Sequence, residues 1–319
     1  MHPHIMKVIE LIKKRGMVCH INTNFTLVTK ERAKGLIDAE ADQIIVSLWA
    51  ATPDTYVRCH PNKTGDTFYQ MIDVLHYLIG EKKDKPHVKL YNVMFTHNYH
   101  EFDDMLRLAL DLLVDAAEFT VVDTIPGKTD SLLLSEGMKK FILSRIARLK
   151  KNVPYDYEWH EGNYIFHFDD GMSLKLFKFE HFIRRLLNQD CVVGDYDSNI
   201  IQKMPCYIGW IFARILSNGD VNACLKAHKI PVGNINRNSF REIWNGDKQR
   251  EFRKHALRIE KDESFFSMIG NDPHARVGCL KSCDDITRNV IWHHRIEALN
   301  PSQREMLEGV PGKYNLAPC

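Results

Sequence analysis

The sequence lacks any long apolar run and any strong excess of charge of one sign. No stretch of about eighteen or more apolar residues occurs, so no segment is long enough for a transmembrane helix. The opening Met1-His2-Pro3-His4 has no apolar core of the kind found in secretory signal peptides. The 43 basic and 41 acidic residues leave a net charge of +2, which provides no electrostatic attraction to nucleic acids or membranes. We therefore expect a cytoplasmic protein that binds neither.

Internal repeats and low-complexity tracts are also absent, and the composition is that of a globular protein. Hydrophobic residues make up 44% and charged residues 26% of the 319 positions, enough for a sizeable core. The eight cysteines need an explanation, because disulfides are disfavoured in a reducing cytosol. Clustered cysteines in that compartment are typical of metal ligands or redox groups. Four of them gather toward the carboxyl end, whereas Cys19, Cys59, Cys191 and Cys319 are scattered.

The first half of the chain alternates helical and strand patterns. Helical spacing of apolar residues predicts helices over residues 5–14, 29–39, 67–79, 101–114 and 135–149, with Thr29 as an N-cap. Short apolar runs predict strands over 17–21, 43–48, 88–96 and 119–123. Such alternation predicts an α/β fold with a parallel sheet or barrel. An eight-stranded barrel needs about 250 residues and this region has about 150, so we expect an open sheet or part of a barrel.

Ligands of such sheets bind beyond the carboxyl ends of the strands. That rule directs attention to Asn22 and Asn24, to Ser47, to His97-Asn98 and to Asp123. Beyond residue 150 the alternation ends. Residues 155–169 have the pattern of a hairpin with its turn at 161–163, and residues 174–188 that of a helix. A second unit begins at Cys206, with strands predicted over 208–216 and 221–225 around a turn at 217–220.

Four cysteines form the strongest candidate site. Cys206 and Cys224 flank the predicted hairpin, whose turn brings both thiols to the same end of the ribbon. Cys279 and Cys283 lie in a short loop as C-x3-C, so both can face one centre. Four convergent thiolates form either a tetrahedral zinc site or the ligand set of an iron–sulfur cluster. Spacing alone favours neither, and four unrelated buried or free cysteines are the remaining alternative.

Two stretches resemble radical S-adenosylmethionine (SAM) enzymes. The carboxyl-terminal stretch contains Cys206, Ser217-Asn218-Gly219-Asp220-Val221, Cys224, Pro231-Val232-Gly233-Asn234-Ile235 and Phe240-Arg241-Glu242-Ile243-Trp244-Asn245. This order is similar to the SPASM/twitch extension of that family. The resemblance implies that Cys206, Cys224, Cys279 and Cys283 hold one auxiliary 4Fe–4S cluster, as in the shorter twitch form. A second 4Fe–4S cluster is expected only in a longer parent chain.

The amino-terminal stretch is similar to the middle of a radical SAM core. The matching segments are His2-Pro3-His4-Ile5, Ile21-Asn22-Thr23-Asn24 and Ile45-Val46-Ser47-Leu48. The resemblance implies a partial (β/α) barrel missing its first strands, in which Ser47 and Asn98 contact SAM. Phe25 and Trp49-Ala50 stand where the family has glycine-containing "TNG" and "DG" segments. The implied domains are a partial core over 1–150, a connecting region over 151–205, a twitch/SPASM cluster domain over 206–290 and a tail over 291–319.

The resemblance also implies an activity. Radical SAM enzymes use a 5′-deoxyadenosyl radical, and this chain would accordingly be an oxidoreductase that oxidises or modifies a peptide or a sugar-like small molecule. Its electron donor would be a flavodoxin or ferredoxin. The family's catalytic C-x3-C-x2-C and its GGEP motif do not occur in the sequence. We therefore expect a fragment or a mis-called start, and the alternative is a non-catalytic iron–sulfur or zinc-binding module, a degenerate homologue.

Overall fold

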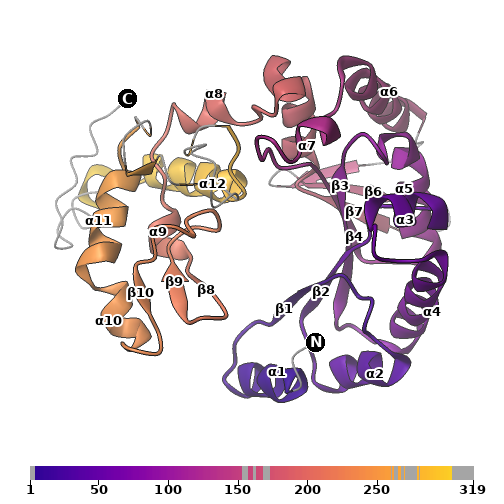
Figure 1. Ribbon diagram of the computed structural model, residues 1–319, viewed down its shortest axis with the longest axis horizontal. Helices are drawn as coiled ribbons and strands as arrows, with labels where there is room; N and C mark the ends of the chain where they lie inside the picture. Colours follow the sequence, from indigo (N-terminus) through magenta and orange to yellow (C-terminus); the bar gives the residue numbers. More distant parts are fainter. Residues whose placement is uncertain are drawn as a thin grey trace. The chain divides into compact units, whose positions relative to one another are not determined.

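The structure, a computed structural model, divides the chain into two compact units (Figure 1). The residues it describes are 4–152, 157–160, 163–167, 173–259, 261, 265–266, 269, 279 and 281–303. The first unit comprises Met1–Val122 and Leu132–Leu187, and the second comprises Asp123–Ser131 and Asn188–Cys319. No helix in the described ranges is long and apolar enough to cross a membrane.

A seven-stranded sheet forms the centre of the first unit. Its order is β1-β2-β3-β4-β7-β6-β5. The strands β1 (His20–Thr23), β2 (Gln43–Ser47), β3 (His87–Met94) and β4 (Ala116–Val121) are parallel neighbours. The strand β7 (Ser173–Phe177) adds to β4 in parallel, and β6 (Asn163–His167) and β5 (Tyr157–His160) continue antiparallel. The predicted α/β fold with a parallel sheet is confirmed.

Helices alternate with these strands along the chain. They are α1 (Ile5–Lys14), α2 (Lys30–Asp38), α3 (Pro53–Cys59), α4 (Gly65–Glu81), α5 (Phe102–Asp111), α6 (Glu136–Asn152) and α7 (Phe179–Leu187), with the 3-10 turns Tyr99–Glu101 and Asp130–Leu132. The Thr29 hydroxyl caps α2 by accepting from the Arg32 N–H, as the sequence predicts. The helix α3 is not predicted from the sequence, although Thr52 caps it and Pro53 begins it.

The sheet has one apolar face and one more polar face. Val46, Leu90 and Ala117 are register partners across β2, β3 and β4, and all three are buried. The next row includes Ser47 and Tyr91, which are half-buried. Alternate residues of a strand point to opposite faces, so Ser47 and Tyr91 lie on the face away from this apolar row. The helices α4 and α5 run along the same side of the sheet (Figure 1).

Two predicted elements are wrong in part. The helix predicted over 174–188 is the strand β7 followed by α7, because Leu174 and Leu176 are buried in strand alternation. The strand predicted over 208–216 begins instead as the helical turn α9 (Ile208–Ile211) and reaches extended pairing only at β8 (Arg214–Ile215). Gly209 lies in this turn, and its backbone packs so closely on Phe252 that a Cβ would lie 3.1 Å from the ring.

The second unit contains a small antiparallel sheet of order β10-β9-β8. Its strands are β8, β9 (Asp220–Asn222) and β10 (Gly233–Asn234), and its helices besides α9 are α8 (Ser198–Ile201), α10 (Phe240–Trp244), α11 (Asp247–Ala256) and α12 (Ile286–Glu297), with a 3-10 helix over Gln189–Val193. The predicted turn between β8 and β9 is confirmed, and Gly219 holds it with φ of 87°. The predicted domain boundaries at 150, 205 and 290 stay predictions, although β5, β6 and β7 belong to the sheet of the first unit.

Candidate metal centre

The four predicted cysteine ligands come from separate segments of the second unit. Cys206 precedes α9, and its N–H donates to the Ala256 carbonyl at the end of α11, at 2.8 Å. Cys224 follows β9 by two residues. Cys206, Cys224 and Cys279 pack against the apolar core of this unit, which includes Val221 and Phe252.

Cys283 is held by a hydrogen bond of its own, since its N–H donates to Asp197 Oδ2 at 2.9 Å. None of the four cysteines forms a disulfide bond. The structure therefore places the four predicted cysteines in one unit, with their sulfurs available as donors. Their role as ligands stays a prediction at this point.

The thiols lie within electrostatic reach of one another. Burial raises the pKa of Cys206 to about 12, and the neighbouring Cys279 adds to this shift. Burial raises the pKa of Cys224 and of Cys283 well above the usual value, and the other thiols of the group raise both further. Burial also raises the pKa of Cys279, against the opposing charges of Lys261 and Lys226. The four thiols thus lie near enough to one another to influence each other's pKa.

Two of the sulfurs accept a hydrogen bond from the backbone two residues later. The Lys226 N–H donates to Cys224 Sγ at 3.4 Å, and the Ile208 N–H lowers the pKa of Cys206 in the same way. Such bonds favour the thiolate over the thiol. Hydrogen bonds to ligand sulfurs also set the potential of iron–sulfur clusters. The local backbone at both cysteines therefore suits thiolate ligands.

The donor set fits a thiolate-bound metal centre. Within the described residues, no three Cys, His, Asp or Glu side chains are already grouped closely enough to hold an ion. The chemistry of the four thiols nevertheless matches a cluster or zinc. Asn222, two residues before Cys224, is fully buried, and among the described residues neither its Nδ2 nor its Oδ1 has a hydrogen-bond partner. A buried amide without partners is costly, and a bound group nearby would relieve that cost.

The second predicted site lies at the carboxyl end of β2 in the first unit. Ser47 is the last residue of β2 and is half-buried. Asn98 is fully buried, and its Nδ2 donates to the carbonyls of Trp49 at 2.9 Å and Val93 at 2.8 Å. Its Oδ1 accepts from the Phe95 N–H at 2.9 Å. Asn98 thus fixes the backbone, and direct contact of Ser47 or Asn98 with SAM stays a prediction.

Polar side chains hold the loop after β2 in place. Asn92 Oδ1 accepts from the Trp49 N–H at 3.1 Å, and Glu101 Oε2 accepts from the Ala51 N–H at 2.7 Å. Trp49 has φ of 62° and Phe25 has φ of 60°, the left-handed region that glycine prefers. Phe25, which stands at the glycine of the family's "TNG" segment, therefore keeps a glycine-like backbone, whereas Trp49 stands at the aspartate of the "DG" segment.

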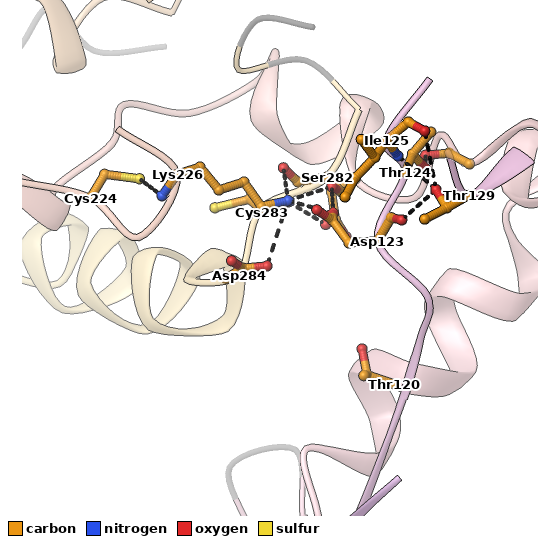
Figure 2. A network of polar contacts seen from close by, with 12 residues as sticks. Thr120, Asp123, Thr124, Ile125, Thr129, Cys224, Lys226, Ser282, Cys283 and Asp284 are labelled. Atoms are coloured by element: carbon orange, nitrogen blue, oxygen red, sulfur yellow. Dashed lines mark hydrogen bonds and ion pairs between the residues drawn. The ribbon is translucent and has the colours of Figure 1, made fainter. Parts of the chain in front are cut away.

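Sequence reasoning missed Lys226, whose ammonium lies among charged and polar groups next to the cysteine segments (Figure 2). Asp123, one of its partners, is singled out by the sequence only as a residue past a strand end. No pattern in the sequence connects the two, because 103 positions separate them. The one feature of the sequence that could have pointed to Lys226 is its position two residues after the predicted ligand Cys224.

Comparison with known proteins bears on both units. Residues 206–264 match the SPASM family, described as an iron–sulfur cluster-binding domain. The fold matches SuiB of Streptococcus suis, solved with its precursor peptide SuiA, with a TM-score of 0.55 at 12% identity over 88% of this chain and 62% of that chain. It also matches anSMEcpe with bound AdoMet, with a TM-score of 0.52 at 14% identity over 81% of this chain and 63% of that chain. The chain therefore carries a stretch that matches the SPASM family and shares its fold with SuiB and anSMEcpe.

A curated relative of this chain comes from Pyrococcus furiosus. It is the "tungsten-containing aldehyde ferredoxin oxidoreductase cofactor-modifying protein", 24% identical over 258 residues. The match covers 79% of this chain and 66% of the relative. The chain therefore spans just under two thirds of the length of the relative. The predicted fold class, an α/β radical SAM-type sheet with a SPASM domain, is confirmed.

Proposed function

We propose that this chain is a radical SAM/SPASM protein and that it holds one auxiliary 4Fe–4S cluster on Cys206, Cys224, Cys279 and Cys283. The observation that carries the proposal is that Cys206, Cys224 and Cys279 pack against the same apolar core of the second unit. Cys283 belongs to the same unit, where its N–H donates to Asp197. Two of the four cysteines lie inside the residues that match the SPASM family. Clusters of this type are held by four cysteine thiolates. A bound cluster would supply one-electron redox chemistry.

One feature favours iron and sulfide over zinc: the SPASM match is to an iron–sulfur cluster-binding domain. The backbone N–H groups at Cys206 and Cys224 suit metal-bound thiolates of either kind. A non-catalytic cluster- or zinc-binding module is the second candidate function. It is favoured by one specific observation, that C-x3-C-x2-C does not occur in the sequence.

SAM belongs, in this proposal, at the carboxyl end of β2. Ser47 would contact SAM through its half-buried hydroxyl, and Asn98 would act through the Trp49 backbone that it holds. The proposal is supported by the shared fold, because SuiB and anSMEcpe were both solved with SAM bound. SAM would supply the radical that abstracts a substrate hydrogen. That step requires a catalytic cluster, and this sequence has no C-x3-C-x2-C to hold one.

A peptide is the proposed substrate class. SuiB, which shares the fold, was solved with a precursor peptide. The Pyrococcus furiosus relative is described instead as acting on a cofactor, so a small molecule is the alternative substrate. A flavodoxin or ferredoxin would deliver electrons. The radical step, the substrate and the donor are all proposals for the whole enzyme.

Single cysteine substitutions test the ligand set. Cys206→Ala, Cys224→Ala, Cys279→Ala and Cys283→Ala are each reconstituted anaerobically with iron and sulfide, and iron content and the EPR spectrum of the reduced protein are recorded. Cys191→Ala is the matched control, since Cys191 is a buried cysteine of the same unit that forms no disulfide and is not one of the four proposed ligands. We expect each of the four ligand variants to lose most of its iron and the control to keep it. Full iron retention in any of the four removes that residue from the ligand set.

A further inference from the structure

Lys226 is a buried cation inside a polar network of the second unit (Figure 2). Its Nζ lies 2.6 Å from Asp123 Oδ1 and 2.7 Å from Ser282 Oγ. It also donates to the Ser282 carbonyl at 3.3 Å and lies 3.6 Å from Asp284 Oδ1. Ser282 Oγ donates in turn to Asp123 Oδ1 at 2.7 Å. The Lys226 side chain is only 8% exposed, so these contacts take the place of water.

This network joins three segments that are distant in the sequence. The backbone N–H of Lys226 donates to Cys224 Sγ, so the residue is fixed to the first pair of cysteines. Ser282 and Asp284 are the two residues on either side of Cys283. Asp123 is the first residue of the segment Asp123–Ser131. The Thr129 hydroxyl closes a loop within this segment by donating to the Asp123 carbonyl at 2.9 Å. One side chain thus ties the Cys224 turn to the loop that carries Cys283.

The buried ammonium of Lys226 is compensated by acidic partners. Its Nζ pairs with Asp123 and lies close to the Asp284 carboxylate. Asp284 directly follows Cys283, so the positive charge is held next to the loop that carries this cysteine. Four thiolates in one place repel each other, and a fixed positive charge beside them reduces that repulsion. Neutral side chains at this position would provide neither the charge nor the three donors.

We propose that Lys226 is a positioning residue for the auxiliary cluster, holding the Cys283 loop in register with Cys224 and placing a positive charge beside the ligand sulfurs. This inference rests on the proposed function, because it takes the four cysteines as ligands. It adds that the residues flanking Cys283 and the remote Asp123 form part of the same site. Groups that orient metal ligands typically change metal affinity by about 10- to 100-fold when removed.

Three variants separate position from charge. Lys226→Met keeps the length of the side chain and removes its charge and donors, whereas Lys226→Arg keeps the charge. Ser282→Ala leaves every charge in place and removes one hydrogen bond to Lys226 Nζ. Lys203→Met is the matched control, because Lys203 is an exposed lysine of the same unit. The full chain is reconstituted with iron and sulfide, and two quantities are measured: the rate of iron loss to a chelator and the midpoint potential of the cluster.

We expect Lys226→Met to lose iron about tenfold faster or more, with a midpoint potential shifted to more negative values. Lys226→Arg should restore most of the wild-type potential. Ser282→Ala should lose iron faster with an unchanged potential, and Lys203→Met should match the wild type. If Lys226→Met does not fold, Ser282→Ala decides, and its failure to accelerate iron loss overturns the inference.

Two different failures are distinguishable. A wild-type chain that takes up no iron overturns the proposed function and the inference together. A wild-type chain that binds the cluster, with Lys226→Met indistinguishable from it in iron loss and potential, overturns the inference alone.

Discussion

The side-chain amide of Asn98 donates to the main-chain carbonyl of Trp49, 49 positions earlier in the chain, at 2.9 Å. Through this bond the segment after β3 holds the loop after β2. Trp49 keeps a left-handed backbone there, with φ of 62°. A non-glycine residue in that conformation costs about 1–2 kcal/mol, and the surrounding hydrogen bonds hold it in place. Asn98 is therefore a structural support for the proposed SAM edge.

Asn98→Ala tests that assignment. The substitution removes three hydrogen bonds from a fully buried position. We expect the free energy of unfolding to fall by about 2–3 kcal/mol, because buried backbone groups lose their partners. Urea unfolding of the apo-protein measures the change, with the exposed Asn24→Ala as control. Weaker SAM binding at unchanged stability would instead mark Asn98 as a direct contact.

Gly219 and Gly127 form a matched pair of glycines in the second unit, both with positive φ. A Cβ on Gly219 would lie 2.3 Å from Asn236 Nδ2, whereas a Cβ on Gly127 meets nothing within 4 Å. Asn236 Nδ2 donates to the Asn218 carbonyl, so moving it breaks a hydrogen bond of the turn.

We expect Gly127→Ala to cost about 1 kcal/mol for its backbone conformation alone. Gly219→Ala should cost about 1–2 kcal/mol more, for the disrupted hydrogen bonds around the turn. Thermal unfolding of both variants measures the difference. Equal losses would show that the asparagines around Gly219 move aside freely.

Asp42 predicts a pH dependence of stability in the first unit. Its carboxylate accepts from Lys13 Nζ at 2.5 Å, Lys85 Nζ at 2.6 Å and the Cys19 N–H at 2.8 Å. These hydrogen bonds hold the pKa of Asp42 well below its usual range. In the unfolded chain the Asp42 carboxylate takes up a proton near its ordinary pKa of about 3.9, whereas in the folded chain it stays ionised to lower pH. The free energy of unfolding therefore falls as the pH drops below about 4.

Asp42→Asn removes the titrating group. At pH 7 the variant should be less stable by about 2 kcal/mol, since hydrogen bonds to a charged acceptor are lost. Between pH 5 and pH 3 its free energy of unfolding should also fall less than that of the wild type. The difference between the two losses is the contribution of Asp42 to the acid response. Urea midpoints measured across this range give the comparison. Parallel curves for the two proteins would show that other carboxylates dominate the acid response.

Local sequence patterns predicted the parallel core well. The helices α1 and α4, the N-cap at Thr29 and the strands β2 and β3 follow from apolar spacing and capping, which are local properties. The helix predicted over 174–188 was wrong in its first part. The apolar spacing of Leu174, Leu176 and the residues after them is compatible with a helix as well as with a strand. Only pairing with β4 and β6 decides for a strand.

Sequence alone could predict only those residues of the site whose type is characteristic of metal binding. Cysteine spacing singled out Cys206 and Cys224, because few other roles suit paired thiols in this composition. Lys226 and Ser282 could not be found this way, since lysine and serine are common on surfaces. Their importance comes from a fold that brings Ser282 to Asp123 across 159 positions.

Quantitation of iron, acid-labile sulfide and zinc in the full chain after anaerobic reconstitution tests the central claim most directly. The claim is that Cys206, Cys224, Cys279 and Cys283 bind a 4Fe–4S cluster. The account predicts about four irons and about four sulfides per chain, with little zinc. About one zinc per chain with no iron would contradict it and identify a structural metal module instead.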